Sequence, residues 1–504
     1  MRTLTEVLRS RATSDRDRVA LDFEERSFTF GELQTHADDW AAALAAAGAA
    51  RGSRIALMSA NRPEFVFAVY GAFQLGAAVV MCSPAWKATE VQHADAVVSP
   101  TLAVGDEAGC HTLAEALPGM PVLALDDATL AKADARGPVV DDPDTDAVLV
   151  FSSGTTGMPK GVRHTHRTLG HAVEHWIAAL GLTDRDRFQI ATPPVHILGL
   201  LNIVTAVAAG ARVRLHPRFD LDASLRAIEQ ERMTLEMAVA PIALGMANHP
   251  RLEDFDLSSL RYIMWGATPV TEEVARTVTR RTGVRWLPAY GTSEVPVIAA
   301  NPVQEDPDRW RLDSVGLPPP GVSFRIADPE TGAVLDPGAT GEIEVFSPSA
   351  MAGYLPDSET AAAFHDGWYR TGDIGWMEAE GWLHITDRLK EMIKVRGFQV
   401  APAEIEAVLH GDARVRDCAV FGVDDPQLGE AIVAAVALVD GAHVSADELQ
   451  DQVAEQLAGY KRIRHVVIVD EIPRLPSGKA LRRRLKQEWL ADRLRPSGSG
   501  GQGR

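Results

Sequence analysis

The chain has 504 residues, of which 46% are hydrophobic and 24% charged, and this composition is typical of a globular protein in water. One hydrophobic core does not grow to this length, so the sequence predicts two or more domains. The formal net charge of −19 argues against nucleic acid as the main partner.

Cysteine spacing and apolar runs indicate the compartment. Cys82, Cys110 and Cys418 show neither the paired spacing of a disulfide framework nor that of a zinc site. The N-terminal segment is charged and has no secretory apolar core, and the longest apolar run, 198–209, is too short to span a bilayer. We therefore expect a cytoplasmic protein with reduced thiols and no membrane span.

The first 150 residues alternate between helical and strand-like segments. Hydrophobic spacing predicts a helix over 30–47 and another over 64–75, and short apolar runs predict strands over 54–58 and 77–81. Strands that alternate with helices imply a parallel α/β architecture. The stretch 126–146, rich in Asp and Pro, is expected to be a loop.

A glycine- and hydroxyl-rich segment follows the apolar run 147–151, which predicts a buried strand. Glycines let a turn bring backbone N–H groups close to a ligand, and successive N–H groups form a concave nest that favours anions. The segment is not a Walker A motif, because no Ser or Thr follows Lys160. An ordinary surface loop is the alternative. The candidate polyphosphate ligands are Ser152, Ser153, Gly154, Thr155, Thr156, Gly157 and Lys160.

The next predicted strands, 186–190 and 211–215, enclose an apolar segment that contains His196. A lone histidine in such a run is more often a buried core residue with its hydrogen bonds satisfied than a functional residue. The stretch 262–269 predicts a further strand that ends in a turn, and its Trp265 either shapes a binding cavity or fills the core. The turn residues are Gly266, Ala267 and Thr268.

The segment 290–294 combines three side-chain types that suit a nucleotide. A tyrosine ring can stack on a base, a hydroxyl can reach a phosphate, and a carboxylate can hold Mg²⁺, which prefers oxygen ligands and keeps several waters. Taken alone, such a string is also common in turns. Its members are Tyr290, Gly291, Thr292, Ser293 and Glu294.

The C-terminal part of the chain first becomes β-rich and then α+β. Alternating strands from 316 to 348 predict a compact β-subdomain. Asp373, after a turn glycine, either accepts the hydroxyls of a sugar or caps its own turn. The charged segment 386–391 predicts a domain boundary, and the small α+β domain beyond it closes with a proline-stiffened loop that carries Lys479.

Seven segments between Phe151 and Lys479 resemble, in order, the motifs of the adenylate-forming superfamily, which includes acyl- and aryl-CoA synthetases, luciferases and peptide-synthetase adenylation domains. With the stretch 61–64 and Gly76-Ala77, the resemblance covers nearly the whole chain. Among the subfamilies, the chain looks most like the 4-coumarate/fatty acid-CoA ligases. The resemblance implies ATP, Mg²⁺ and CoA as cofactor and co-substrates, and a small-molecule carboxylic acid as substrate.

The resemblance also implies the fold and its division. The expected fold is α/β, with a large N-terminal region of α/β subdomains, a small β-rich subdomain and a small mobile α+β C-terminal domain. The N-terminal domain spans 1–386, a hinge spans 387–390 with Lys390 as its pivot, and a lid spans 391–495. The tail 496–504, rich in Gly and Ser, is expected to be disordered.

Site residues follow from the resemblance one by one. The catalytic candidates are Lys479, Glu294 and His196, with His196 at the mouth of the acyl pocket and Glu294 as the ligand of Mg²⁺. Asp373 and Arg388 are expected to contact the ribose. The other nucleotide or CoA contacts are expected from Gly266, Ala267, Thr268, Tyr290, Gly291, Thr292, Ser293, Lys394 and Gly397.

The implied reaction converts a small apolar acid, aryl or fatty, to acyl-AMP and then to acyl-CoA, with release of pyrophosphate and AMP. The alternative is another acceptor, such as a carrier-protein thiol, an amine or another small nucleophile. A non-catalytic nucleotide- or acyl-binding protein is a third interpretation, which requires a lost catalytic residue. The sequence carries no signal for the oligomeric state.

Overall fold

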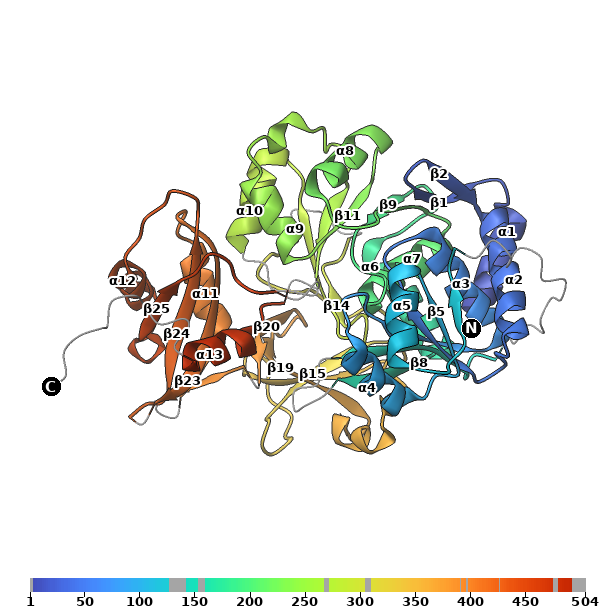
Figure 1. Cartoon of the computed structure of the whole chain (residues 1–504). Coiled ribbons are helices and arrows are strands. Elements are labelled where there is room, and N and C mark those ends of the chain that lie inside the picture. The colour runs from blue at the N-terminus through green and yellow to red at the C-terminus, as the bar shows by residue number, and fades with distance from the viewer. Residues whose placement is uncertain are drawn as a thin grey trace.

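The computed structural model describes residues 3–126, 142–152, 159–266, 272–303, 310–389, 391–395, 398–425, 427–474 and 479–491. A large body contains the elements from α1 to β20, and a smaller C-terminal unit beside it contains those from β21 to α13 (Figure 1). This division confirms the predicted architecture of a large α/β region and a small α+β domain. The loop predicted at 126–146, the pivot Lys390 and the tail 496–504 lie largely or wholly outside the described residues.

A seven-stranded sheet forms one half of the body, with the order β17-β8-β7-β4-β3-β5-β6. The five strands from β7 to β6 in this order are parallel, and β8 and β17 extend the sheet antiparallel. The predicted strand 54–58 is confirmed to the residue. The bounds are β3 (Arg54–Met58), β4 (Ala78–Cys82), β5 (Leu102–Gly105), β6 (Val122–Ala124), β7 (Asp146–Ser152), β8 (Lys160–Thr165) and β17 (Gly353–Leu355).

An eight-stranded sheet forms the other half, with the order β14-β13-β12-β11-β9-β10-β1-β2. Its six inner strands are parallel, and the two edge strands run antiparallel to their neighbours. The bounds are β1 (Val19–Phe23), β2 (Arg26–Thr29), β9 (Arg187–Ile190), β10 (Arg212–Leu215), β11 (Leu235–Ala238), β12 (Tyr262–Trp265), β13 (Trp286–Tyr290) and β14 (Ala299–Ala300).

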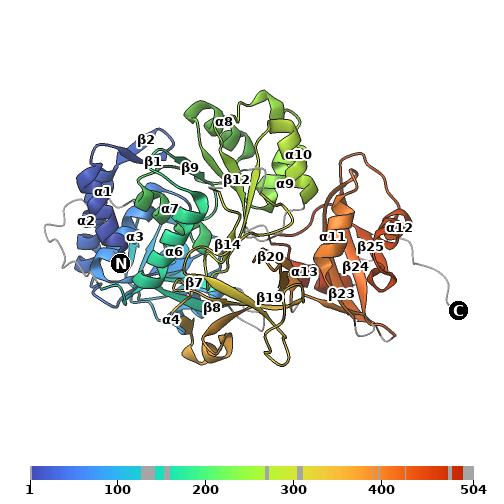
Figure 2. The ribbon, with the colours of Figure 1, turned by 180° about the vertical axis from the view of Figure 1, so that it is seen from behind.

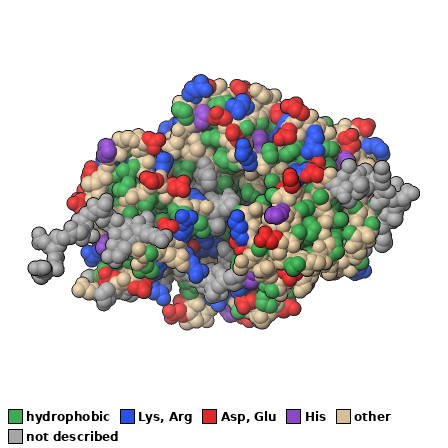
Figure 3. All heavy atoms as spheres, in the orientation of Figure 1, with side chains coloured by type: hydrophobic (Ala, Val, Ile, Leu, Met, Phe, Trp, Pro, Cys, Tyr) green, Lys and Arg blue, Asp and Glu red, His purple; other side chains and the backbone are tan. Residues whose placement is uncertain are grey.

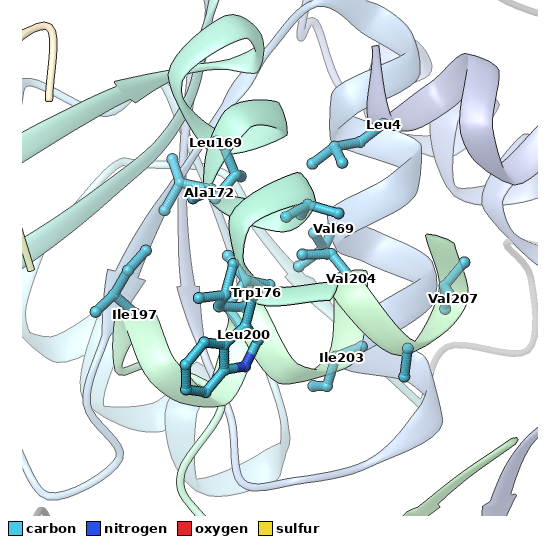
Figure 4. Close-up of a cluster of buried hydrophobic side chains, with 14 of the residues drawn as sticks. Leu4, Val69, Leu169, Ala172, Trp176, Ile197, Leu200, Ile203, Val204 and Val207 are labelled. Carbon is cyan, nitrogen blue, oxygen red and sulfur yellow. The ribbon is translucent and has the colours of Figure 1, made fainter. Parts of the chain in front are cut away.

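Helices pack on both faces of both sheets, as parallel sheets require. The largest core joins the inner faces of the two sheets to helices α1 (Leu4–Ser14), α2 (Phe30–Ala46), α3 (Pro63–Leu75), α6 (His166–Leu180) and α7 (Ile197–Ala209). Figure 4 shows side chains of α1, α3, α6 and α7 meeting in it. Separate cores lie under α4 (Ala88–Val98) and α5 (Glu107–Ala116), and under α8 (Leu221–Glu231), α9 (Ala240–Asn248) and α10 (Glu272–Thr282).

A third sheet forms the predicted β-subdomain at the side of the body that faces the C-terminal unit (Figure 2). It is antiparallel, and its longest strand, β19, pairs with β16, β18 and β20. Short 3₁₀ turns η2 (Leu252–Asp254), η4 (Asp357–Glu359) and η5 (Ala361–Ala363) complete the body. The strands are β15 (Ser323–Ala327), β16 (Gly341–Phe346), β18 (Phe364–His365), β19 (Trp368–Met377) and β20 (Leu383–Arg388).

The C-terminal unit has a hydrophobic core of its own, drawn from residues 393 to 489. The core lies between a five-stranded sheet and three helices. No helix in the described part of the chain has the length and apolar content that a membrane crossing requires. The elements are β21 (Ile393–Val395), β22 (Phe398–Val400), α11 (Pro402–His410), β23 (Val415–Asp425), β24 (Gly429–Leu438), α12 (Ala446–Gln456), η6 (Gly459–Lys461), β25 (His465–Ile468) and α13 (Arg482–Leu490).

Candidate active site

A buried polar cluster forms where the eight-stranded sheet meets the β-subdomain. Tyr290, at the end of β13, donates its hydroxyl hydrogen to Asp373 Oδ2, and Arg388 Nε lies 2.9 Å from Asp373 Oδ1. Asp373 on β19 and Arg388 on β20 are register partners, so the hairpin itself places the ion pair. Only 4% of Asp373 is exposed, and burial raises the pKa of its carboxyl against the opposing charge of Arg388. The cluster offers a carboxylate and a guanidinium to a polar ligand.

The turn after Tyr290 requires glycine at position 291. A Cβ atom there would lie 2.1 Å from the carbonyl oxygen of Pro296, which is far inside van der Waals contact. Thr292 N donates to Val295 O at 2.9 Å, and Val295 N donates to the Thr292 hydroxyl at 3.0 Å. These bonds fix the direction in which the chain carries Ser293 and Glu294.

Glu294 is buried close to this cluster, with 7% of the residue exposed. Its Oε1 accepts the hydroxyl hydrogen of Tyr354 at 2.8 Å, and Lys160 Nζ lies 5.3 Å from the centre of the Tyr354 ring. Lys160 also forms an ion pair with Glu359. Tyr354 therefore stands between the acidic side chain of one candidate motif and the basic side chain of another.

The oxygen atoms of Glu294 suit Mg²⁺, although they do not form a closed metal site. The described residues include no group of three or more His, Cys, Asp or Glu side chains that converge on one point. A single carboxylate fits an ion whose remaining ligands are water and substrate phosphates, which is how Mg²⁺ is commonly bound.

The two ends of the predicted phosphate segment lie opposite one another. Ser152 ends β7 and Lys160 begins β8, and the two residues are register partners in that antiparallel pair. The intervening candidates Ser153, Gly154, Thr155, Thr156 and Gly157 lie outside the described residues.

Lys479 of the C-terminal unit pairs with Glu391, whose Oε1 lies 3.1 Å from its Nζ. Its positive charge also acts to lower the pKa of Asp373. Figure 3 shows Lys and Arg side chains along the hollow between the body and the C-terminal unit. This local positive charge contrasts with the net charge of −19 and suits a polyanion.

The other candidates have no described contact with the cluster's side chains or lie outside the described residues. His196 occupies the N-cap position of α7 without a side-chain capping hydrogen bond, and burial lowers the pKa of its imidazole. Gly266 follows β12 and is buried, whereas Ala267 and Thr268 are among the residues not described. Lys394 has an exposed side chain, and its backbone N–H donates to Glu430 Oε2 at 2.8 Å. Gly397 is also not described.

Comparison with known families identifies the family to which the chain belongs. Residues 8–355 match the family model of AMP-binding enzymes, and residues 404–479 match that of the C-terminal domain of these enzymes. The chain belongs to the AMP-binding enzyme family.

Relatives of this AMP-binding enzyme include CoA ligases. Indoleacetate–CoA ligase of Aromatoleum aromaticum is 35% identical over 96% of the chain and 98% of its own length. 4-Coumarate–CoA ligase 2 of Nicotiana tabacum is 34% identical over 92% of the chain and 90% of its own length. The structure of the amide bond synthetase McbA from Marinactinospora thermotolerans superimposes with a TM-score of 0.86 at 31% identity, covering 97% of this chain and all of that one.

The AMP-binding enzyme thus falls in the adenylate-forming superfamily with the acyl- and aryl-CoA ligases, as the sequence motifs predicted. It is an AMP-forming ligase of the acid–thiol class, a class that uses ATP and Mg²⁺ with CoA as co-substrate.

Several residues that contact the candidate site of the AMP-binding enzyme were not predicted from its sequence. Tyr354 hydrogen-bonds Glu294 and contacts Lys160, but nothing in its local sequence marks it. Glu391 and Arg482 pair across 91 residues, and each stands in a charged segment where many side chains are simply solvated. Trp265, for which two interpretations were open, packs edge to face on Trp286 in the core under α8 to α10.

Proposed function

We propose that this enzyme activates a small apolar carboxylic acid, aryl or fatty, to acyl-AMP and transfers the acyl group to CoA. The observation that carries the proposal is the buried Asp373–Arg388 pair beside Tyr290, and the effect of the Lys479 charge on the pKa of Asp373 supports it. Such a site presents positive charge and a sugar-binding carboxylate to one nucleotide.

In the first half-reaction, a carboxylate oxygen of the acid attacks the α-phosphorus of ATP while the bond to the leaving pyrophosphate breaks. The acid is already ionised at pH 7, so no general base is needed, and catalysis comes from positioning and from stabilisation of charge. Lys479 bridges the acid and the α-phosphate, Asp373 and Arg388 hold the ribose, and Tyr290 stacks on the base. The segment 152–160 holds the pyrophosphate. Glu294 holds the Mg²⁺ ion, which neutralises phosphate charge when bound.

In the second half-reaction, the C-terminal unit rotates about Lys390 and withdraws Lys479. The CoA thiol loses its proton, its sulfur bonds to the acyl carbon, and the bond from that carbon to the AMP oxygen breaks. Lys394, at the middle of β21, and Gly397 are the residues proposed to line the path of the thiol arm. The exposure of the Lys394 side chain supports access to this hairpin from solvent.

An aryl acid is the preferred substrate class within this proposal. Both CoA-ligase relatives are named for aryl acids, 4-coumarate and indoleacetate. In this proposal the acyl pocket adjoins His196 and Val297, and two facts support an apolar pocket: burial favours the uncharged imidazole of His196, and the side chain of Val297 is buried. The three free cysteines support a reducing compartment such as the cytoplasm.

A pyrophosphate-release screen over aryl and aliphatic acids, run with and without CoA, tests the proposal. We expect ATP-dependent pyrophosphate release with one class of acid and stoichiometric acyl-CoA and AMP when CoA is present. If no acid supports release, the proposed activity is wrong.

A second candidate function keeps the adenylation step and replaces CoA by an amine. The likeness to the amide bond synthetase favours it, because that structure matches this chain over its whole length. Product analysis of the same reactions with an added amine and no CoA distinguishes the two. An amide formed faster than the thioester would support the second candidate.

A further inference from the structure

Glu391 connects the lysine of the C-terminal unit to a buried arginine. Its Oε1 lies 3.1 Å from Lys479 Nζ, and its Oε2 forms an ion pair with the guanidinium of Arg482. Arg482 is the first residue of α13, whereas Glu391 lies two positions before β21. The carboxylate thus joins two chain segments that are distant in sequence, since Glu391 and Arg482 are 91 residues apart.

Arg482 is held in place independently of Glu391. Its Nη2 donates to both carboxylate oxygens of Glu406 on α11, at 2.8 Å each. Glu406 Oε1 also accepts the backbone N–H of Val420 at 2.7 Å, so the carboxylate is itself fixed to β23. Because a guanidinium held at two points keeps its orientation, Arg482 gives Glu391 a fixed partner.

The charges around Glu391 keep it ionised. Burial acts to raise the pKa of Glu391, but the positive charges of Arg482, Lys479 and Arg388 outweigh burial and lower it below its ordinary value. An ionised carboxylate held by a fixed guanidinium is a defined attachment point for an ammonium group.

Lysine needs such an attachment because its ammonium sits on a flexible four-carbon stem, and fixing that stem costs conformational entropy. We propose that Glu391 is a positioning residue for acyl-AMP formation, which holds the Lys479 ammonium at the reaction site before the reactants bind. The ammonium has three N–H donors, so a bond to Glu391 leaves others for the anionic reactants. The inference rests on the proposed function, in which Lys479 bridges the acid and the α-phosphate.

Glu406 provides a matched control. It binds the same guanidinium as Glu391 and its side chain is less exposed, 12% against 23%, but the described contacts of Lys479 include Glu391 and not Glu406. A purely structural role of the ion-pair network predicts equal effects of Glu391→Gln and Glu406→Gln. A positioning role predicts an effect on catalysis from Glu391→Gln alone.

The experiment measures both half-reactions and the melting temperature for the full-length wild type, Glu391→Gln, Glu406→Gln, Lys479→Ala and the Glu391→Gln/Lys479→Ala double variant. We expect Glu391→Gln to lower kcat of ATP–pyrophosphate exchange about tenfold or more, since misplacement of a reacting group is costly. The KM for ATP should change by less than about threefold, and so should the rate of thioester formation from supplied acyl-AMP, since neither requires the positioned ammonium. In the Lys479→Ala background, Glu391→Gln should have no further effect.

Two results would overturn the inference while the wild type is active. One is that Glu391→Gln and Glu406→Gln lower both half-reactions in proportion to their losses in melting temperature. The other is that the double variant is slower than Lys479→Ala by the full factor of Glu391→Gln. A wild type without exchange for any acid would instead overturn the proposed function, and this inference with it.

Discussion

At the scale of single residues, the choice between lysine and arginine is informative. The chain has 50 basic residues, of which only eight are lysines, and Lys160, Lys394 and Lys479 lie in segments that match motifs of the family. A compact ammonium is not interchangeable with a planar guanidinium, so a lysine kept in an arginine-rich chain points to a site that needs the smaller cation.

Lys479→Ala should block acyl-AMP formation and spare the second half-reaction. Loss of a cation that stabilises transition-state charge should lower pyrophosphate exchange about 100-fold or more. The rate of thioester formation from supplied acyl-AMP should stay close to that of the wild type, because in the proposed mechanism Lys479 is withdrawn from the site before this step. Lys461→Ala, which removes a lysine paired with Glu404 in the same unit, is the control. Equal loss of both half-reactions would contradict the proposed role.

Gly291→Ala should damage the nucleotide site through its backbone. The added methyl group would lie 2.1 Å from the carbonyl oxygen of Pro296, so the turn that carries Glu294 must move. We expect a loss of about 1–3 kcal/mol in the free energy of unfolding, as for other overpacked sites, and a higher KM for ATP. Gly459→Ala, where a Cβ meets no atom within 4 Å, should leave both values unchanged.

At the scale of elements, strand β11 contains a buried acid that makes stability depend on pH. Burial raises the pKa of Glu236 to about 8, against hydrogen bonds from Gln189 and the backbone. The folded protein therefore holds a proton that unfolding releases. The stabilising contribution is complete below pH 4.5, the ordinary pKa, and is lost as pH rises towards 8.

Between pH 6 and 8, this residue should lower the free energy of unfolding by up to about 1.4 kcal/mol per pH unit. Burial lowers the pKa of the neighbouring His216 to about 4, so that imidazole does not titrate in this range. Glu236→Gln should reduce the pH dependence of the free energy of unfolding, as measured by urea unfolding at several pH values. Identical slopes for the variant and the wild type would show that Glu236 does not carry the effect.

Elements built from apolar runs could be predicted from sequence, whereas polar ends that continue a strand could not. The apolar runs 418–423 and 431–439 predict two strands, which correspond to β23 and β24, but β23 extends from Val415 to Asp425. Its polar ends stay in the sheet because their side chains find partners, as Asp417 does with Arg474. Such partners come from distant segments and leave no local pattern.

The same limit applies to the site. The Asp373–Arg388 pair joins two residues in motifs that resemble those of the family, so the resemblance was sufficient to suggest both, and a local hairpin brings them together. The contacts of Tyr354 and Arg482 depend on how separate elements pack, and no periodicity or motif in one sequence contains that information.

At the scale of the whole molecule, the C-terminal unit should fold without the body. Its core forms one cluster that is separate from those of the body. A fragment covering residues 391–495, the predicted lid, is therefore expected to unfold cooperatively in a thermal melt followed by circular dichroism. A fragment with no cooperative transition would mean that the unit depends on the body for stability.

A side-chain hydrogen bond links the body to helix α11 beyond the predicted hinge. Asp387 Oδ2, on the last strand of the body, accepts the N–H of Ala403 in the first turn of α11 at 3.0 Å. A swing of the lid about Lys390 would separate these atoms and uncover that amide. The rate of deuterium uptake at the Ala403 amide would then report this movement. We expect slow uptake with ATP alone and faster uptake once acyl-AMP has formed. Unchanged uptake throughout turnover would mean that β20 and α11 stay docked.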